Sequence, residues 1–295
     1  MKNFESISRE IEKATKRTFK VLKSYPVAGG DINSAYRLDS EDCSFFVKFN
    51  HPDLLPMFAA EERGLKELSA THTVAVPEPI IFGQTKEYSF LVLEYLEFGT
   101  PTKASERLLG KQLAELHKQK QSFFGWHCAN TIGSTPQINT QSQNWLDFWR
   151  DQRLRFQLQL AAKKGYGGRL QINGDKLCDN LAALFTDYQP QPSLLHGDLW
   201  AGNAAVDKKG CPVIFDPACY YGDRETDLAM TELFGGFSQD FYAAYQDVWA
   251  LDSGFSYRKT LYKLYHILNH LNLFGGGYLR QAENMMAMIL AEIGA

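Results

Sequence analysis

Two short segments of the chain carry the residue types that phosphoryl transfer requires. The first, Leu194 to Asn203, reads LLHGDLWAGN and contains Asp198 and, five residues later, Asn203. The second ends an apolar run, Val213-Ile214-Phe215, with Asp216. Transfer of a phosphoryl group needs a carboxylate that accepts the proton of the attacking hydroxyl, and oxygen ligands for the Mg²⁺ that bridges the nucleotide phosphates. The order His-x-Asp-x-x-x-x-Asn, then Asp, therefore predicts a base at Asp198 and metal ligands at Asn203 and Asp216. The alternative is two unrelated turns capped by Asp and Asn.

The elements around these segments divide into a β-rich and a helical part. Short apolar runs at 35–38 and 45–49, joined by a polar turn, predict a hairpin, and 88–95 predicts another strand. Apolar residues at helical spacing predict helices at 7–20, 54–70, 105–121, 144–162 and 175–188, and a β-like patch lies at 194–215. The expected fold class is α+β. We expect a small β-rich lobe from Met1 to about Tyr95 and a larger, mainly helical lobe from Leu96 to Ala295.

Composition excludes several classes of function. Lys and Arg total 31 against 34 Asp and Glu, a net charge of −3, and the sequence lacks basic runs longer than two residues, so no nucleic-acid partner is expected. The N-terminus lacks a signal-peptide stretch, and no window approaches the 18 or more apolar residues of a membrane helix, so no membrane partner is expected either. The five cysteines form no C-x-x-C pair, which favours reduced thiols in the cytoplasm over zinc binding.

The longer motifs give the chain a narrower resemblance. The segments concerned are HGDLWAGN (196–203), DPACYYGDRETDLAM (216–230), FGW (124–126), IGSTPQ (132–137) and LNHLNLFGGGY (268–278). Together they resemble the fructosamine kinase, or ketosamine kinase, family, over about Gly29 to Gln281. This family is related to aminoglycoside phosphotransferases and choline kinases. The resemblance implies a two-lobed, protein-kinase-like fold, with residues 1–95 as the N-terminal nucleotide-binding lobe and residues 96–295 as the C-terminal catalytic and substrate lobe. It also implies ATP- and Mg²⁺-dependent phosphorylation of a ketosamine, on a small molecule or a glycated lysine, at O3 of the sugar, in the repair of glycated amines.

Carried over residue by residue, the family pattern assigns Asp198 as the catalytic base and Asn203 and Asp216 as metal ligands. Lys48, within the strand FFVKF, resembles the lysine that pairs with the nucleotide phosphates. Its ion-pair partner would be Glu61 or Glu62. These neighbours point about 100° apart on a helix, and the spacing from Met57 and Phe58 favours Glu61.

The family pattern also implies nucleotide contacts for two further segments, the turn at 29–33 and the segment 94–96. The turn formed by Gly29, Gly30, Asp31, Ile32 and Asn33 fills the place of the phosphate-covering hairpin, although it matches neither a Walker loop nor a dinucleotide fingerprint. Many relatives have cysteine where this chain has Asp31, so redox control through that position is not expected. Glu94, Tyr95 and Leu96 would form the hinge that bonds the adenine, and an ordinary strand end is the alternative.

The remaining candidates divide between substrate contact and structure. Trp200, two residues after Asp198, is expected to stack on the substrate, with core packing as the alternative. His196 and Asp227 are expected to brace the catalytic loop, Asp227 from the start of a helix, and Asp223 is expected to be a turn or capping residue. His266 and His270 are four residues apart but lack the H-E-x-x-H pattern, and a plain helix face is favoured over a metal site.

Trp145, Phe148 and Trp149 predict core packing beside a solvated basic flank, Arg150, Arg153 and Arg155; a wall of the substrate site is the alternative.

Two other functions are compatible with the same chemistry. A kinase for an aminoglycoside, choline or a related alcohol would use the same base and metal ligands. A pseudokinase would bind nucleotide without catalysis, but the presence of Lys48, Asp198, Asn203 and Asp216 is evidence against this reading.

Overall fold

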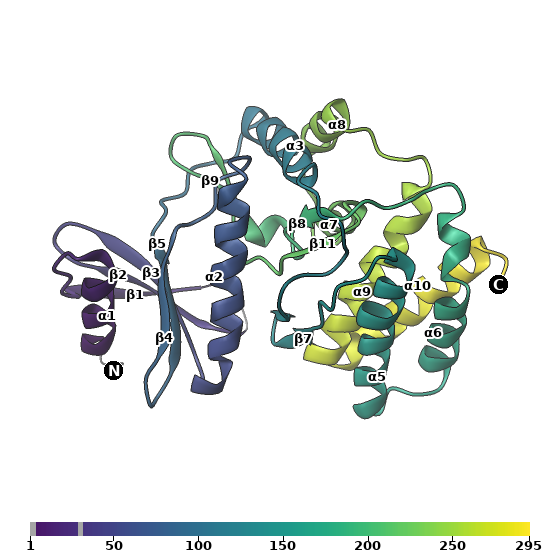
Figure 1. Cartoon of the computed structure of the whole chain (residues 1–295), viewed down its shortest axis with the longest axis horizontal. Helices are drawn as coiled ribbons and strands as arrows, with labels where there is room; N and C mark the ends of the chain where they lie inside the picture. Colours follow the sequence, from purple (N-terminus) through teal and green to yellow (C-terminus); the bar gives the residue numbers. More distant parts are fainter. Residues whose placement is uncertain (1–3, 29–31) are drawn as a thin grey trace. The chain divides into compact units, whose positions relative to one another are not determined.

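The computed structural model describes residues 4–28 and 32–295 (Figure 1). Its contacts group the chain into two compact units. The first comprises Met1–Ser105 and Gly202–Pro217, and the second comprises Glu106–Ala201 and Ala218–Ala295. That residues 1–95 and 96–295 act as the nucleotide and substrate lobes stays a prediction.

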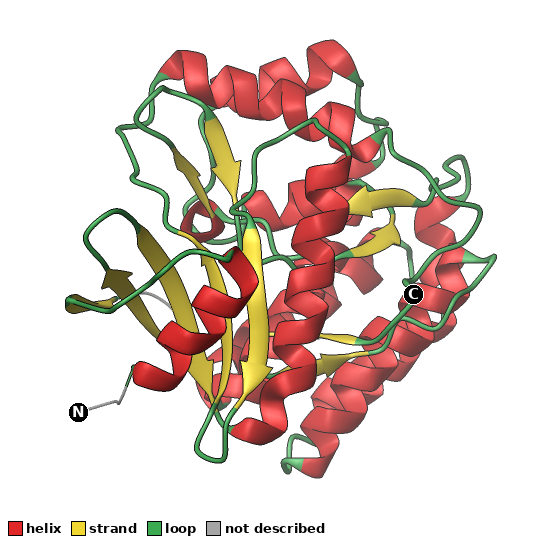
Figure 2. Cartoon of the chain, turned by 60° about the vertical axis from the view of Figure 1, so that its left-hand side comes forward, coloured by secondary structure: helices red, strands yellow, loops and turns green. Residues whose placement is uncertain are grey.

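The first unit is built on a five-stranded antiparallel sheet (Figure 2). In spatial order the strands are β1 (Lys23–Val27), β2 (Ser34–Asp39), β3 (Ser44–Asn50), β5 (Ser89–Glu94) and β4 (Pro79–Gln84). The predicted hairpin is confirmed as β2 and β3, and the predicted strand at 88–95 as β5. Strand β3 therefore lies at the centre of the sheet, with a partner on each side.

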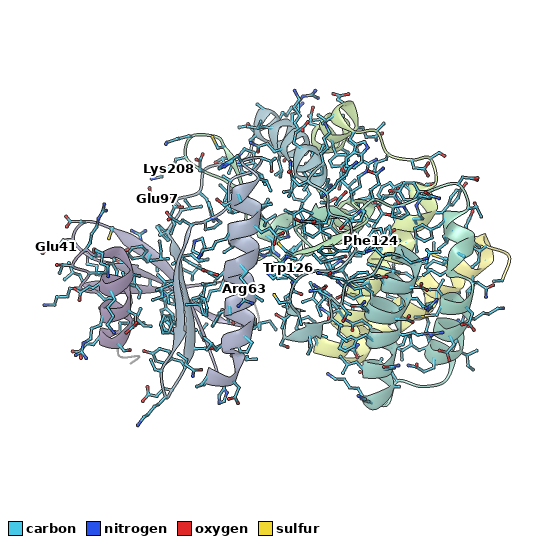
Figure 3. The ribbon with its side chains drawn as sticks, viewed as in Figure 1. Glu41, Arg63, Glu97, Phe124, Trp126 and Lys208 are labelled. Carbon is cyan, nitrogen blue, oxygen red and sulfur yellow. The ribbon has the colours of Figure 1, made fainter. Side chains whose placement is uncertain are left out.

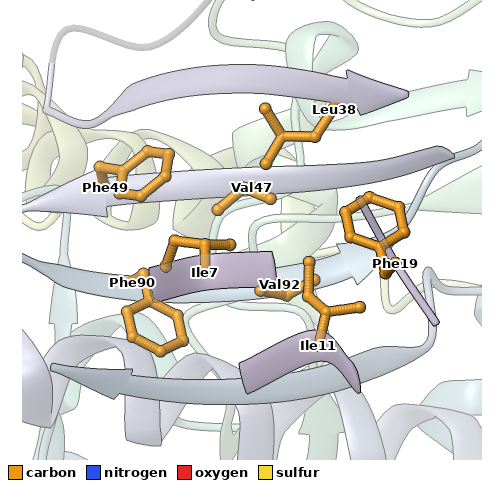
Figure 4. Packing of buried hydrophobic residues seen from close by; sticks show 8 residues of the cluster. All are labelled: Ile7, Ile11, Phe19, Leu38, Val47, Phe49, Phe90 and Val92. Carbon is orange, nitrogen blue, oxygen red and sulfur yellow. The ribbon is translucent and has the colours of Figure 1, made fainter. Parts of the chain in front are cut away.

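The two faces of this sheet bury different residues because side chains alternate along a strand. Val47 and Phe49 of β3, with Phe90 and Val92 of β5, pack with Ile7 and Ile11 of helix α1 (Glu5–Thr15), as Figure 4 shows. Leu91 and Leu93 pack instead with Met57, Phe58 and Leu65 of helix α2 (Leu55–Ala70), which follows the short 3₁₀ helix η1 (Pro52–Leu54). Lys48, between Val47 and Phe49, thus belongs to the α2 face.

The helix predicted at 7–20 is wrong in its second half. Helix α1 ends at Thr15, and Lys16 adopts the left-handed conformation with φ 59° while its N–H donates to Glu12 O. The turn brings Phe19 onto the sheet, where it is 1% exposed and its N–H donates to the Glu12 carboxylate. Burying this ring outweighs continuing the helix, because a fully buried aromatic side chain contributes several kcal/mol, on the order of 2–3.

A second hairpin, distant in sequence, completes the first unit. Strands β9 (Ala204–Val206) and β10 (Pro212–Ile214) pair with each other. The Ile214 N–H donates to Ala75 O at 3.0 Å, and the Gly99 N–H donates to Val206 O at 2.7 Å. A side chain at Gly99 would not fit, since its Cβ would lie 2.8 Å from Asp207 O. Lys208 also pairs with Glu97 (Figure 3).

The second unit is mainly helical. Its helices are α3 (Lys103–His117, beginning in the first unit), α4 (Trp145–Trp149), α5 (Phe156–Lys163), α6 (Arg169–Asp179), α7 (Glu225–Thr231), α8 (Gln239–Val248), α9 (Phe255–Phe274) and α10 (Leu279–Glu292). Its short strands are β6 (Asn130–Ile132), β7 (Thr135–Gln137), β8 (Ser193–Leu195) and β11 (Tyr220–Gly222); short 3₁₀ helices are η3 (Leu181–Phe185), η4 (Ala201–Asn203, ending in the first unit) and η5 (Gly276–Tyr278). Among helices of the described ranges, none combines the length and apolar character that a membrane span requires.

Helix positions in this unit follow the sequence pattern with local corrections. The helix predicted at 144–162 is present, but a π-helical stretch, Arg150–Arg155, separates α4 from α5. The helix predicted at 105–121 stops at His117. The one predicted at 175–188 starts earlier, at Arg169, and breaks at Asn180 before η3.

The aromatic residues of α4 are core residues, as predicted. Trp145, Phe148 and Trp149 are 3%, 1% and 0% exposed. The solvated basic flank is wrong for Arg153, which is fully buried: its guanidinium lies 4.6 Å from the Phe148 ring centroid and 4.3 Å from that of Tyr220. It also donates to Asn139 Oδ1 at 2.7 Å. Arg153 is tolerated because ring faces and oxygen acceptors replace water around the charge.

Candidate active site

Lys48 forms two ion pairs inside the first unit. Its side chain is 5% exposed, and Nζ donates to Glu61 Oε1 at 2.6 Å and to Asp216 Oδ1 at 2.5 Å. Glu62, the competing partner, pairs with Lys66 instead. The predicted Lys48–Glu61 pair is therefore confirmed, because the alternation on β3 and the helical phase of α2 direct the two side chains to the same place.

The two carboxylates decide the charge of this buried lysine. Burial by itself lowers the pKa of Lys48, but the charges of Asp216 and Glu61 outweigh burial and raise the pKa above its usual range. The ammonium therefore stays protonated at neutral pH. Its position beside Asp216 places a permanent positive charge next to a predicted metal ligand.

Asn203 and Asp216 lie at the same end of the β9–β10 hairpin. Asn203 immediately precedes β9, Asp216 follows β10 by two residues, and the Phe215 N–H donates to Asn203 O at 3.0 Å. Asp216 has φ +59°, a left-handed conformation that costs a non-glycine residue on the order of 1–3 kcal/mol. Its carboxylate is 44% exposed while Oδ1 contacts Lys48.

This donor set fits a magnesium ion. A carboxylate and an amide oxygen are ligands that Mg²⁺ accepts, and Mg²⁺ usually takes few protein ligands because it keeps water and phosphate oxygens. In residues 4–28 and 32–295, no group of three or more His, Cys, Asp or Glu side chains could hold a metal. The metal-binding roles of Asn203 and Asp216 stay predictions.

The loop that carries Asp198 is held by hydrogen bonds to one carboxylate of the second unit, that of Asp227. Asp227, on α7, accepts the backbone N–H of His196 at 2.7 Å and that of Gly197 at 2.8 Å. Gly197 has φ +82°, and a Cβ there would lie 2.1 Å from Ala218 O. His196 is fully buried, and its Nδ1 accepts the Asp198 N–H at 3.3 Å. The bracing roles predicted for His196 and Asp227 are confirmed.

A buried hydrogen-bond chain supports Asp227 in turn. Arg224 donates to the Tyr245 hydroxyl at 3.1 Å, and this hydroxyl lies 2.8 Å from His117 Nδ1. His117 Nε2 lies 3.1 Å from Asp227 Oδ2, so Nε2 is the donor to the carboxylate. Although burial opposes it, this contact holds the pKa of Asp227 below its usual range. His117 and Tyr245 were not predicted, because their distance from Asp227 along the chain gives no local signal.

Asp223 shows the capping role expected of it. Its carboxylate accepts the Glu225 N–H at 3.0 Å at the start of α7. It also accepts the hydroxyl groups of Tyr188 at 2.9 Å and Tyr262 at 2.6 Å. The beginning of α7, and with it Asp227, is thereby tied to the core of the second unit.

Trp200 is half-buried in the second unit and is not a core residue. Its ring packs edge-to-face on Phe234, with centroids 6.1 Å apart. The core-packing alternative is therefore not supported, and substrate contact by Trp200 stays a prediction.

The remaining predicted nucleotide residues lie in the first unit. Gly29, Gly30 and Asp31 are outside the described residues. Asn50 Nδ2 donates to Ile32 O at 2.9 Å and to Asn33 Oδ1 at 2.7 Å, which ties the end of the predicted phosphate-covering turn to β3.

The predicted hinge continues from the end of β5. The Glu94 N–H donates to Glu78 O at 2.8 Å, so this group is engaged within the first unit. Tyr95 and Leu96 are half-buried, and the Arg37 guanidinium lies 4.4 Å from the Tyr95 ring centroid. The nucleotide contacts of these residues stay predictions.

The two histidines of α9 are joined by a hydrogen bond within the helix. His266 is 4% exposed, and His270 Nδ1 donates to His266 O at 2.8 Å. Burial, assisted by the neighbouring His270, lowers the pKa of His266 to about 3. The folded protein therefore holds this imidazole uncharged.

A pH dependence of stability follows from His266. The unfolded chain binds this proton with a pKa of about 6.5, well above the folded value, so His266 stabilises the fold fully only above about pH 6.5. As the pH falls from there toward 3, the free energy of unfolding should drop by up to about 1.4 kcal/mol per pH unit. Urea unfolding between pH 7 and 4 measures this slope. His266→Phe should flatten it, whereas the exposed control His51→Phe should not; equal slopes in the two variants would contradict the assignment.

The chain matches a family model and curated proteins over most of its length. The fructosamine kinase family model matches residues 3–292. A Synechocystis protein assigned as a ketoamine kinase is 45% identical over 288 residues, covering 97% of each chain. The chloroplastic protein-ribulosamine 3-kinase of Arabidopsis thaliana is 42% identical over 269 residues, covering 90% of this chain and 82% of its own.

Solved structures of similar proteins show the fold. A crystal structure assigned as a fructosamine-3-kinase, from Haemophilus somnus, has a TM-score of 0.89 at 28% identity and covers 96% of both chains. An aminoglycoside phosphotransferase has a TM-score of 0.65 at 14% identity, covers 98% of this chain and 100% of its own, and supports the fold alone. The predicted kinase-like α+β fold is confirmed, and the chain belongs to the fructosamine kinase family.

Proposed function

We propose that this chain transfers the γ-phosphoryl group of ATP to O3 of the sugar in ketosamines, either free or on glycated lysine side chains. The observation that carries the proposal is the ion-pair set Lys48–Glu61 and Lys48–Asp216. It holds a buried ammonium beside a carboxylate suited to Mg²⁺, in a chain whose relatives include one named as a protein-ribulosamine 3-kinase. The role is the repair of glycated amines.

Each residue has a separate part in this reaction. Asp198 accepts the proton of the sugar hydroxyl while the hydroxyl oxygen forms a bond to the γ-phosphorus of ATP. The bond between the γ-phosphorus and the oxygen that bridges it to the β-phosphorus breaks, and ADP leaves. Asn203 and Asp216 would hold Mg²⁺, which when bound would supply positive charge at the phosphate oxygens. Lys48 contributes a second fixed positive charge, and Glu61 orients it. The backbone bonds to Asp227 keep the Asp198 loop in one conformation.

Two alternatives are weaker on these observations. An aminoglycoside or choline kinase would share the fold and the base, but its likeness here is structural, at 14% identity for the aminoglycoside enzyme. A pseudokinase would not need to retain both ion pairs of Lys48 together with Asp198 and Asn203.

We infer a reducing compartment, the cytoplasm, as the place of action. All five cysteines, Cys43, Cys128, Cys178, Cys211 and Cys219, are free thiols. Thiols of this number persist unpaired where glutathione and thioredoxin keep them reduced.

ATP consumption with a panel of acceptors tests the activity. Ribuloselysine or fructoselysine should stimulate ATP consumption with Mg²⁺ present, and choline and kanamycin should not, because the narrow family motifs belong to ketosamine kinases. Phosphorus NMR of the product then identifies the esterified hydroxyl. Turnover of kanamycin or choline above that of both ketosamines would overturn the proposal.

Replacement of the base separates chemistry from binding. Asp198→Asn keeps the size of the side chain but removes the proton acceptor, so kcat on the best ketosamine should fall by roughly 10²-fold or more. The affinity for ATP should change little, because Asp198 does not hold the nucleotide in this assignment. Steady-state kinetics and nucleotide titration measure both quantities, and near-normal turnover would remove Asp198 from the role of base.

Replacement of the two predicted metal ligands should have unequal effects. Asp216→Ala removes an anionic ligand and should abolish productive Mg-ATP binding, whereas Asn203→Ala removes a neutral ligand and should weaken it less. Titration of each variant with Mg²⁺ at saturating ATP gives the comparison. Equal Mg²⁺ dependence in wild type and Asp216→Ala would exclude Asp216 from the metal site.

A further inference from the structure

Five rings form a continuous group in the second unit, called here the aromatic cluster. The Trp200 and Phe234 centroids are 6.1 Å apart, and those of Phe234 and His270 are 4.7 Å apart. His270 in turn lies 5.4 Å from Phe274 and 5.2 Å from Tyr278. The rings come from three separate segments: the catalytic loop, the connection between α7 and α8, and the end of α9 with η5.

The aromatic cluster lies at the surface of its unit and not in the core. Trp200, Phe234, His270 and Tyr278 are half-buried, and Phe274 is 49% exposed. The core residues Leu268 and Leu271, on the same helix, are fully buried. Folding therefore leaves part of the surface of each of these residues accessible to water. Contiguous, partly exposed aromatic surface of this kind is typical of binding sites in soluble proteins.

The backbone presents two of the rings at glycine turns. Phe234 is followed by Gly235 and Gly236, with φ +95° and +70°, and Phe274 is followed by Gly275, with φ +94°. These left-handed conformations suit glycine and turn the chain directly after each ring. The rings thus project from the points where the α7–α8 connection and helix α9 reverse.

The aromatic cluster is uncharged. Burial lowers the pKa of His270, and its Nδ1 hydrogen is donated to His266 O, so the ring takes part as a neutral imidazole. The nearest carboxylate along the chain from Phe234, that of Glu232, is neutralised by Lys259 at 3.1 Å and Lys263 at 2.6 Å. What the cluster offers a ligand is ring faces. Ring faces attract alkyl chains and, through their quadrupole, organic cations.

We propose that the aromatic cluster binds the amine side of the ketosamine, meaning its protonated secondary amine and the carbon chain attached to it. The inference rests on the proposed function. Trp200 lies two residues from Asp198, so one end of the cluster is continuous with the loop that carries the base. In a ketosamine only the carbons C3, C2 and C1 separate O3 from the amine nitrogen. A substrate with its O3 at Asp198 therefore carries its cation only three carbons from the loop on which Trp200 lies, and the other rings extend from Trp200.

Substrate pairs that differ only in the amine side test this assignment. The probes are the fructose-derived ketosamines of methylamine and of N-α-acetyllysine. Wild type should prefer the lysine compound in kcat/KM by about tenfold. Phe234→Leu and Tyr278→Leu should each reduce this ratio by about 3- to 10-fold through KM, the fold-change expected for one aromatic contact. Leucine keeps the apolar bulk, which protects folding, and melting temperatures verify it. The control Tyr257→Leu removes an exposed ring elsewhere on α9 and should leave the ratio unchanged.

The outcomes separate this inference from the proposed function. Phosphorylation of both ketosamines with equal kcat/KM, in wild type and variants alike, would support the kinase and overturn the aromatic cluster as a binding site. Absence of phosphorylation of both would overturn the kinase and the inference together. A change in sedimentation of the variants without a change in the substrate ratio would show that the rings form a contact between copies of the chain, and would also overturn the proposal.

Discussion

The buried ammonium of Lys48 is the constraint on which the first unit depends. A lysine that is 5% exposed is stable only when charges and hydrogen bonds replace its water, and Glu61 and Asp216 provide both. One carboxylate comes from helix α2 and the other from the β9–β10 hairpin, more than a hundred residues later. The return of this hairpin to the first unit, its bonds to Ala75 and Gly99, and the left-handed conformation of Asp216 all serve to bring that second carboxylate to the lysine.

The second unit contains a buried anion, the Asp227 carboxylate, which also needs polar partners in place of water. Asp227 is 1% exposed, and its charge is balanced by two backbone N–H groups and by His117. Because hydrogen bonds to a buried charge are strong and costly to break, they fix the conformation of the loop that begins at His196. Tyr245 and Arg224 extend the same chain into the core. The rigidity of the Asp198 loop is therefore a property of the whole helical unit and not of the loop sequence.

Two groups of aromatic residues in this chain, the rings of α4 and the aromatic cluster, differ in how deeply they are buried. The rings of α4 are buried, and that of Phe148 lies 4.6 Å from the Arg153 guanidinium, so they stabilise the fold. The rings of the aromatic cluster are also in mutual contact, yet they remain partly exposed, and one of them, Trp200, lies on the catalytic loop. Both groups combine tryptophan with other rings, but the first lies on one helix and the second comes from three separate segments. The difference in exposure is the reason for proposing stability for the first group and ligand binding for the second.

The sequence by itself determined those features that depend on residues close together in the chain. The spacing of Asp198, Asn203 and Asp216 indicated the chemistry, alternation placed Lys48 on a strand, and helical phase selected Glu61 over Glu62. The roles of His196 and Asp227 came from the family motifs. Tertiary structure alone decided the end of α1, the joining of residues 202–217 to the first unit, the burial of Arg153 and the support of Asp227 by His117. These features depend on partners far away in the chain, and periodicity over a few residues carries no information about such partners.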